Sequence, residues 1–156
     1  VPLGSVGCSD CVAEPIELLN HLHTYGNHPV SCAVALRNLE ILETEKLIEN
    51  SEKIGRYFLD GLETLLHHPS VGEVRGTGLW LAIDFTVDKE SRAPFPLENL
   101  MGIIARMKQK GILVKTMGMA LELAPPLIIN KDEIDEVIPI LDECIGEEEK
   151  SMGLVA

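Results

Sequence analysis

The chain has 156 residues, of which 46% are hydrophobic and 24% are charged, a composition typical of a globular domain with its own apolar core. Lys and Arg number 13 against 25 Asp and Glu, so the formal net charge is −12. Nucleic-acid binding needs a basic surface that displaces counterions, and the chain has no cluster of basic residues. We therefore expect no nucleic-acid partner.

The apolar segments are too short for a membrane helix, which needs roughly 20 apolar residues. The segment Ala120 to Asn130, for example, is interrupted by Glu122. No signal-peptide pattern opens the chain, and four cysteines in a chain of this size do not make a disulfide scaffold. We therefore expect a cytoplasmic protein without a membrane partner.

The first elements are predicted to be helical. Ser9 or Asp10 is a suitable N-cap for a short helix that runs to about Leu19. A polar loop follows, and Pro29 suits the first position of a second helix because its missing N–H costs nothing there. The apolar residues from Cys32 to Leu42 cover a wide arc of this second helix, which indicates burial on more than one side.

A third amphipathic helix begins near Leu47 and ends before Pro69. Val71–Arg75 and Leu79–Phe85 are predicted strands, and alternation places the leucines, Ile83 and Phe85 of the second on one face. The two glycines between them, in Gly76-Thr77-Gly78, are best explained as a turn. A dinucleotide-binding motif would need a third glycine and a following helix.

The C-terminal part is predicted to contain two more helices and two more strands. A helix beginning at Leu97 is stopped by Gly111, and the next segments, Ile112–Lys115 and Ala120–Leu123, are predicted strands around a turn at Gly118. Asn130 and Glu133 form a capping-box pattern at the start of the last helix, in which Pro139 predicts a kink. The end, 147–156, is predicted to be a flexible tail. The element order predicts an α+β fold with a mainly antiparallel sheet covered by helices.

Two segments contain residues that could bind a metal ion or a phosphate group. Cys8 and Cys11, with His21, His23 and Cys32 downstream, offer zinc or redox ligands, but no second regular pair follows, so we expect no metal site. The loop from Thr24 to His28 offers a hydroxyl, an aromatic ring and a glycine just before a helix N-terminus. Free N–H groups and the helix dipole favour an anion there, so the loop is either a phosphate site or an ordinary loop.

Three motifs in this order resemble the class III aminotransferases, which depend on pyridoxal 5′-phosphate (PLP). They are the segment His23-Thr24-Tyr25-Gly26-Asn27-His28-Pro29, the segment Val74-Arg75-Gly76-Thr77-Gly78-Leu79, and the segment Leu123-Ala124-Pro125-Pro126-Leu127 before the capped helix. Val1-Pro2-Leu3-Gly4 also looks like the strand that follows the catalytic lysine in that family. The resemblance extends to about Ile145.

The resemblance implies the C-terminal portion of a fold type I enzyme of the aspartate aminotransferase superfamily. Residues 1–28 would be a remnant of the large cofactor-binding domain with the phosphate-contacting loop, 29–46 the bridging helix, and 47–146 the small C-terminal domain. Thr24, with Tyr25 beside it, would contact the phosphate of the PLP bound to the partner subunit of a homodimer. The activity implied is transfer of an amino group from an amino acid or amine to a 2-oxo acid.

Two positions depart from the family pattern. The Schiff-base lysine of the family would lie before Val1, and no lysine of this chain has the matching context, so we expect these 156 residues alone to be inactive. Glu122 stands where many members have an arginine that binds a substrate carboxylate. Glu122 is then either a specificity residue, with the carboxylate held elsewhere or a cationic donor such as a diamine, or a solvated strand residue. The alternative for the whole chain is a free-standing α+β binding or interaction module without catalysis.

Overall fold

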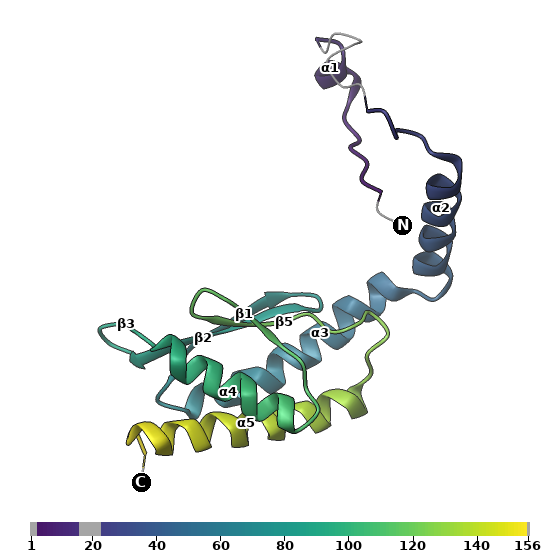
Figure 1. The fold of residues 1–156 in the computed structure, drawn as a ribbon. Coiled ribbons are helices and arrows are strands. Elements are labelled where there is room, and N and C mark those ends of the chain that lie inside the picture. The colour runs from purple at the N-terminus through teal and green to yellow at the C-terminus, as the bar shows by residue number, and fades with distance from the viewer. Residues whose placement is uncertain (1–2, 16–22, 156) are drawn as a thin grey trace. The chain divides into compact units, whose positions relative to one another are not determined.

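The computed structural model describes residues 3–15 and 23–155, and the chain divides into two units, Val1–Lys46 and Leu47–Ala156 (Figure 1). The first unit contains two helices, α1 (Asp10–Ala13) and α2 (Pro29–Thr44). The sequence predicts that the first helix runs to about Leu19, but α1 ends at Ala13 and Glu14 and Pro15 form a turn; residues 16–19 of that prediction lie outside the described residues. So do Val1 and Pro2 of the predicted opening strand, and Leu3 and Gly4 have no regular secondary structure.

The second unit contains one antiparallel sheet, as the sequence predicts. Its strands lie in the order β1-β2-β5-β4, and β3 pairs with the far end of β2. A two-residue turn joins β1 to β2, and its first residue, Gly78, has a φ of 52°, which a tight hairpin requires at that position. The strands are β1 (Val71–Thr77), β2 (Trp80–Asp88), β3 (Ala93–Pro94), β4 (Lys115–Met117) and β5 (Ala120–Leu123).

Three helices cover one face of this sheet (Figure 1). They are α3 (Leu47–Glu63), which continues into the 3-10 helix η1 (Thr64–His67), α4 (Leu97–Gln109) and α5 (Lys131–Met152). Their buried positions recur at helical spacing, which produces one apolar stripe on each helix. The largest fully buried side chains are Phe58, Phe95, Leu62, Leu65, Leu81, Ile83, Leu100, Ile103, Met107, Leu121, Ile134 and Leu141.

Local hydrogen bonds fix the start of α5 and the end of α4. Asn130 and Glu133 form the predicted capping box at the start of α5, in which each side chain accepts a bond from the other residue's backbone N–H. At the end of α4, Gly111 has a φ of 88°, and the N–H groups of Gly111 and Ile112 donate to the carbonyls of Lys108 and Met107. These two bonds form a Schellman motif, so the predicted stop at Gly111 is confirmed.

Two details of the sequence prediction are wrong. Ile112 belongs to the Schellman motif, so the predicted strand over Ile112–Lys115 begins only at Lys115. The predicted flexible tail over 147–156 is helical through Met152, and Glu148 and Glu149 are buried in it. The helix ends where Gly153 takes a φ of 72° and Leu154 donates back to Glu149, a stop signal that the run of glutamates obscured.

Candidate functional site

The predicted phosphate loop leads directly into α2. Residues Thr24 to Asn27 form a turn in which the Gly26 N–H donates to the His23 carbonyl at 3.0 Å, and Asn27 has a φ of 58°. Pro29 occupies the first turn of α2, as predicted, and the N-cap residue His28 makes no side-chain capping bond. The backbone donors at this helix end are therefore not used by a capping side chain, which is the state that an anion site needs.

The side chains of this loop face solvent in the described part of the chain. Thr24 is exposed, and Tyr25 is 86% exposed. No residue of α2 is buried, and Val30, Val34, Leu36 and Leu39 are exposed apolar residues. The wide apolar arc predicts burial on more than one side, but no residue of α2 is buried within the described part of this chain.

The second candidate position, Glu122, lies on the sheet face that the helices do not cover. Strand register places Arg75, Ala82, Glu122 and Lys115 side by side across β1, β2, β5 and β4. Leu121 and Leu123, its neighbours in β5, lie on the opposite face and join the core. The alternation of side chains along β5 therefore separates Glu122 from the core leucines.

Glu122 is held by two partners on this face. The Trp80 indole Nε1 donates to Glu122 Oε1 at 2.7 Å, and Lys115 Nζ lies 2.9 Å from Oε2. The hydrogen bond from Lys115, followed by the bond from Trp80, lowers the pKa of Glu122 below its usual value. Glu122 is only 9% exposed, so the interpretation of this residue as a solvated strand glutamate is wrong.

An open cavity of about 370 Å³ lies over this part of the sheet. Its lining includes Arg75, Thr77, Trp80, Ala82 and Glu122. Arg75 forms an ion pair with Asp84, and the Trp80 ring is largely exposed. The cavity therefore combines an aromatic ring, a carboxylate and a guanidinium, which can orient a small charged molecule.

Glu122 was predicted from the sequence, whereas its partners Trp80 and Lys115, and Arg75 in the lining of the same cavity, were not. The alternation along β2 was a usable signal for Trp80, because it places Trp80 and Ala82 opposite the buried Leu81 and Ile83. Alternation could not place Lys115 in the same way, because the predicted strand covers Ile112–Lys115 whereas the observed strand β4 begins only at Lys115. Thr24 and Tyr25 belong to the first unit and Glu122 to the second.

The cysteine pair forms no candidate metal site in the described residues. Cys8 and Cys11 are exposed and free, and Cys11 contacts the hydroxyl of Ser9. Within residues 3–15 and 23–155, no group of metal-ligating side chains includes either cysteine. His21, named above as a possible ligand, lies outside the described residues.

No helix within residues 3–15 and 23–155 is long and apolar enough to span a bilayer.

Comparison with known proteins identifies the family to which this chain belongs. The family model described as aminotransferase class-III matches residues 1–145. Among curated proteins, the chain is 38% identical over 147 residues to a gamma aminobutyrate transaminase 3, chloroplastic, from Solanum lycopersicum, covering 88% of this chain and 28% of that protein. It is also 38% identical over 132 residues to a vanillin aminotransferase from Capsicum chinense, covering 83% of this chain and 29% of that protein.

Solved structures agree with this match. A thermostable (S)-enantioselective omega-transaminase from Thermomicrobium roseum is 40% identical with a TM-score of 0.80, covering 90% of this chain and 33% of that one. An omega transaminase from Pseudomonas jessenii in complex with PMP is 34% identical with a TM-score of 0.78, covering 86% of this chain and 30% of that one. The chain thus spans about a third or less of the length of these relatives.

Proposed function

Because this chain belongs to the class III aminotransferases, we propose that its full-length protein is a PLP-dependent transaminase that moves an amino group from an amino acid or amine to a 2-oxo acid. Bound PLP supplies the electron sink for such a transfer. The observation that supports the proposal within this chain is the loop from Thr24 to His28, which ends at an α2 N-terminus without a capping side chain. A hydroxyl and free backbone donors at a helix N-terminus fit a phosphate group.

Thr24 would donate its hydroxyl to the PLP phosphate bound by the partner subunit, and Tyr25 would lie beside that phosphate. An exposed Thr24 and Tyr25 suit this role, because the phosphate would belong to another protomer of a homodimer. The exposed apolar residues of α2, including Val34, Leu36 and Leu39, suit burial against the rest of such an assembly.

The catalytic lysine would not come from these 156 residues. Lys110 pairs with Glu143, Lys115 pairs with Glu122, and the Lys89 ammonium donates to the Leu66 carbonyl. Lys131 lies over the Tyr57 ring, 4.3 Å from its centroid. These contacts are structural ones within the second unit. Because no lysine of this sequence has the context of the family's Schiff-base lysine, we propose that the chain alone does not transaminate and that an assay of residues 1–156 with added PLP gives no turnover.

Glu122 would select the substrate. A carboxylate at this position cannot form the two-pronged bond that an arginine makes with a substrate carboxylate, and its lowered pKa keeps it negatively charged. An anionic group in a cavity that also contains the Trp80 ring favours a donor whose distal group is cationic, such as a diamine. Lys115 offsets part of this charge, so the preference depends on the pair rather than on Glu122 alone.

The cofactor role of Thr24 can be tested in the full-length protein by equilibrium binding of two ligands to the apoenzyme. Thr24→Val should raise the Kd for PLP about 10- to 150-fold, because a hydrogen bond to a charged group contributes about 1.5–3 kcal/mol. Thr24→Ser keeps the hydroxyl and should bind PLP nearly as the native protein does. Pyridoxal, which lacks the phosphate, is the matched control ligand, and equal losses for both ligands would contradict the proposed phosphate contact.

The substrate role of Glu122 needs a separate comparison of donors. Glu122→Gln should lower kcat/KM for a terminal diamine about tenfold relative to the monoamine of equal chain length, because only the diamine has a second cation to pair with. An unchanged ratio of the two values would rule out Glu122 as the specificity residue, while activity in both assays would still support a transaminase.

A further inference from the structure

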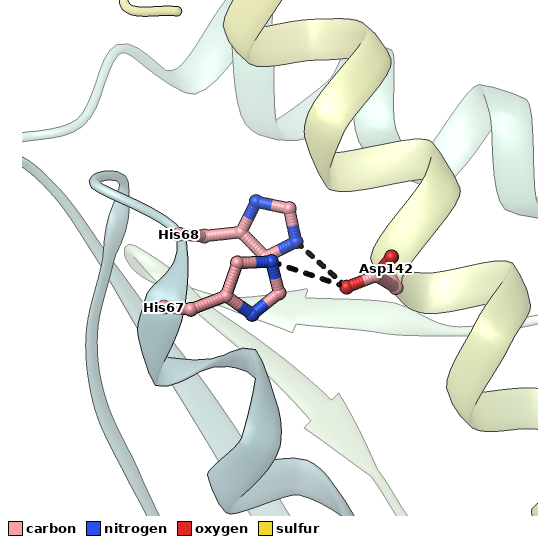
Figure 2. A group of neighbouring side chains, drawn as sticks. All are labelled: His67, His68 and Asp142. Carbon is pink, nitrogen blue, oxygen red and sulfur yellow. Dashed lines mark hydrogen bonds and ion pairs between the residues drawn. The ribbon is translucent and has the colours of Figure 1, made fainter.

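Two adjacent histidines and one aspartate converge at the corner between η1 and α5, away from the residues discussed above. His67 is the last residue of η1 and His68 follows it, whereas Asp142 lies in the middle of α5. Figure 2 shows both imidazole rings directed toward one oxygen of Asp142. His67 Nε2 lies 3.4 Å and His68 Nε2 3.1 Å from Asp142 Oδ1, and the three atoms lie within 4.8 Å of one another.

Local sequence explains why neighbouring histidines point the same way. His67 has 3-10 geometry, but Pro69 disfavours a helical backbone at the residue before it. His68 is accordingly extended, with φ −65° and ψ 131°. This change of backbone at one residue brings the two rings side by side, with centroids 4.1 Å apart and ring planes at 35°.

The opposite nitrogen of each ring is already used. His67 Nδ1 lies 2.8 Å from the Thr64 carbonyl oxygen, which only accepts, so this nitrogen bears the hydrogen. His68 Nδ1 lies 2.7 Å from Glu149 Oε2, whose second oxygen accepts from the Ser70 N–H at 2.9 Å. Glu149 is buried, and the Ser70 N–H orients its carboxylate. A histidine whose Nδ1–H donates to a carbonyl or a carboxylate is the usual arrangement behind a metal ligand.

Nε2 of both rings therefore faces the same carboxylate oxygen, Asp142 Oδ1. Two imidazole nitrogens and one carboxylate oxygen that converge in this way are a donor set that suits a divalent transition-metal ion. Asp142 and Glu149 together supply two negative charges, which a divalent cation balances. Zinc bonds of about 2.0–2.2 Å in tetrahedral geometry separate neighbouring ligand atoms by about 3.3 Å, close to the two distances observed here.

We propose that His67, His68 and Asp142 bind a divalent transition-metal ion, with Zn²⁺ as the expected occupant and Glu149 as the outer partner that orients His68. His67 and Asp142 are exposed on one side, so the fourth position is open to water. The ion would join the η1 corner to α5, two segments that are otherwise far apart in the chain. This site lies outside the proposed transaminase machinery and does not depend on it.

Isothermal titration of Zn²⁺ into the full-length, untagged, PLP-loaded protein, after treatment with a chelator and near neutral pH, tests the proposal. The native protein should take up one Zn²⁺ per chain at this site. His67→Gln and Asp142→Asn should each weaken that binding more than about 100-fold, since loss of only an outer partner of a metal ligand costs about 10- to 100-fold. Both residues are exposed enough for the variants to fold, which circular dichroism and bound PLP would verify.

Two controls separate this site from other uptake of the ion. Asp132→Asn removes the same charge from the exposed first turn of α5 and should leave Zn²⁺ binding unchanged. Cys8→Ser/Cys11→Ser should also leave it unchanged. Added Zn²⁺ should raise the melting temperature of the native protein and of the controls but not of His67→Gln. The proposal is wrong if the His67→Gln/Asp142→Asn double variant binds Zn²⁺ as the native protein does, or if the native protein binds none.

Discussion

Gly55 of α3 lies directly against the backbone of Gly78 in the turn between β1 and β2. A Cβ on Gly55 would overlap the Gly78 carbonyl group, which is backbone and cannot move aside as a flexible side chain can. One turn earlier in α3, the Ser51 hydroxyl accepts a hydrogen bond from the Leu79 N–H at 3.2 Å. The helix therefore approaches the hairpin as closely as a residue without a side chain allows.

Gly55→Ala should consequently destabilise the protein by about 1–3 kcal/mol, the usual cost of forcing extra volume into a packed contact. Urea denaturation of the full-length protein would measure the change in the free energy of unfolding. Gly146→Ala is the matched control, because its new Cβ would make only an ordinary contact of 3.6 Å with His68 Cε1. Alanine favours helix over glycine by about 1 kcal/mol, so this control should be neutral or stabilising. A Gly55→Ala variant as stable as the control would contradict the close approach.

Lys115→Met should raise the pKa of Glu122, because the hydrogen bond from Lys115 is the largest cause of its lowering. A lowered pKa in the folded state stabilises the protein above the usual value of 4.5, and this contribution is lost as the pH falls through the lowered value. The native protein should therefore be more stable than the variant near neutral pH, and the difference should shrink as acid protonates Glu122 in both.

The measurement is the urea midpoint of both proteins across this acidic range. Lys53→Met, at an exposed position of α3, removes the same charge away from Glu122 and controls for net charge. A stability difference that does not change with pH would show that Lys115 acts by packing and not through the ionised carboxylate.

Glu148→Ala should destabilise the packing of α4 on α5. The buried Glu148 carboxylate accepts from Asn99 Nδ2 at 2.7 Å and lies 3.2 Å from the Arg106 guanidinium, and a Cβ on Gly102 would press against the same carboxylate. Removing it leaves Asn99 Nδ2 without this acceptor and Arg106 without the closer of its two carboxylates, which costs about 1–3 kcal/mol.

The neighbouring Glu147→Ala is the control for this prediction. Glu147 also pairs with Arg106, but at 3.7 Å and with its side chain half exposed, and such pairs contribute about 0–1 kcal/mol. Measured by thermal denaturation, Glu148→Ala should lower the Tm clearly more than Glu147→Ala does. Equal shifts would mean that burial of the carboxylate does not determine its contribution.

Asn130→Ala should remove the capping box of α5 at a cost of about 1 kcal/mol, because the Glu133 N–H loses its acceptor. Asn130→Ser can cap in the same way and should retain most of the stability. Urea denaturation would compare the two variants, and similar losses for alanine and serine would indicate that the side-chain cap contributes little.

Most of the helices and strands could be predicted from local patterns. The apolar spacing of α3 and α4, the alternation in β2, the Gly111 stop and the Asn130 cap each depend on residues within a few positions of one another. The errors came from competing local signals. Ile112 has a strand-like side chain but completes a helix-ending motif, and the charged residues Glu148 and Glu149 suggested solvent although they are buried by partners on distant segments.

The sequence by itself determined the family, the α+β class and the loop of Thr24, because motif order and local periodicity are properties of the chain alone. Only the tertiary structure decided that Glu122 is buried between Trp80 and Lys115, and that His67 and His68 meet Asp142. Those groupings depend on strand register and on the packing of α5 against the η1 corner. Both arise when distant segments share one core, so no local pattern in the sequence records them.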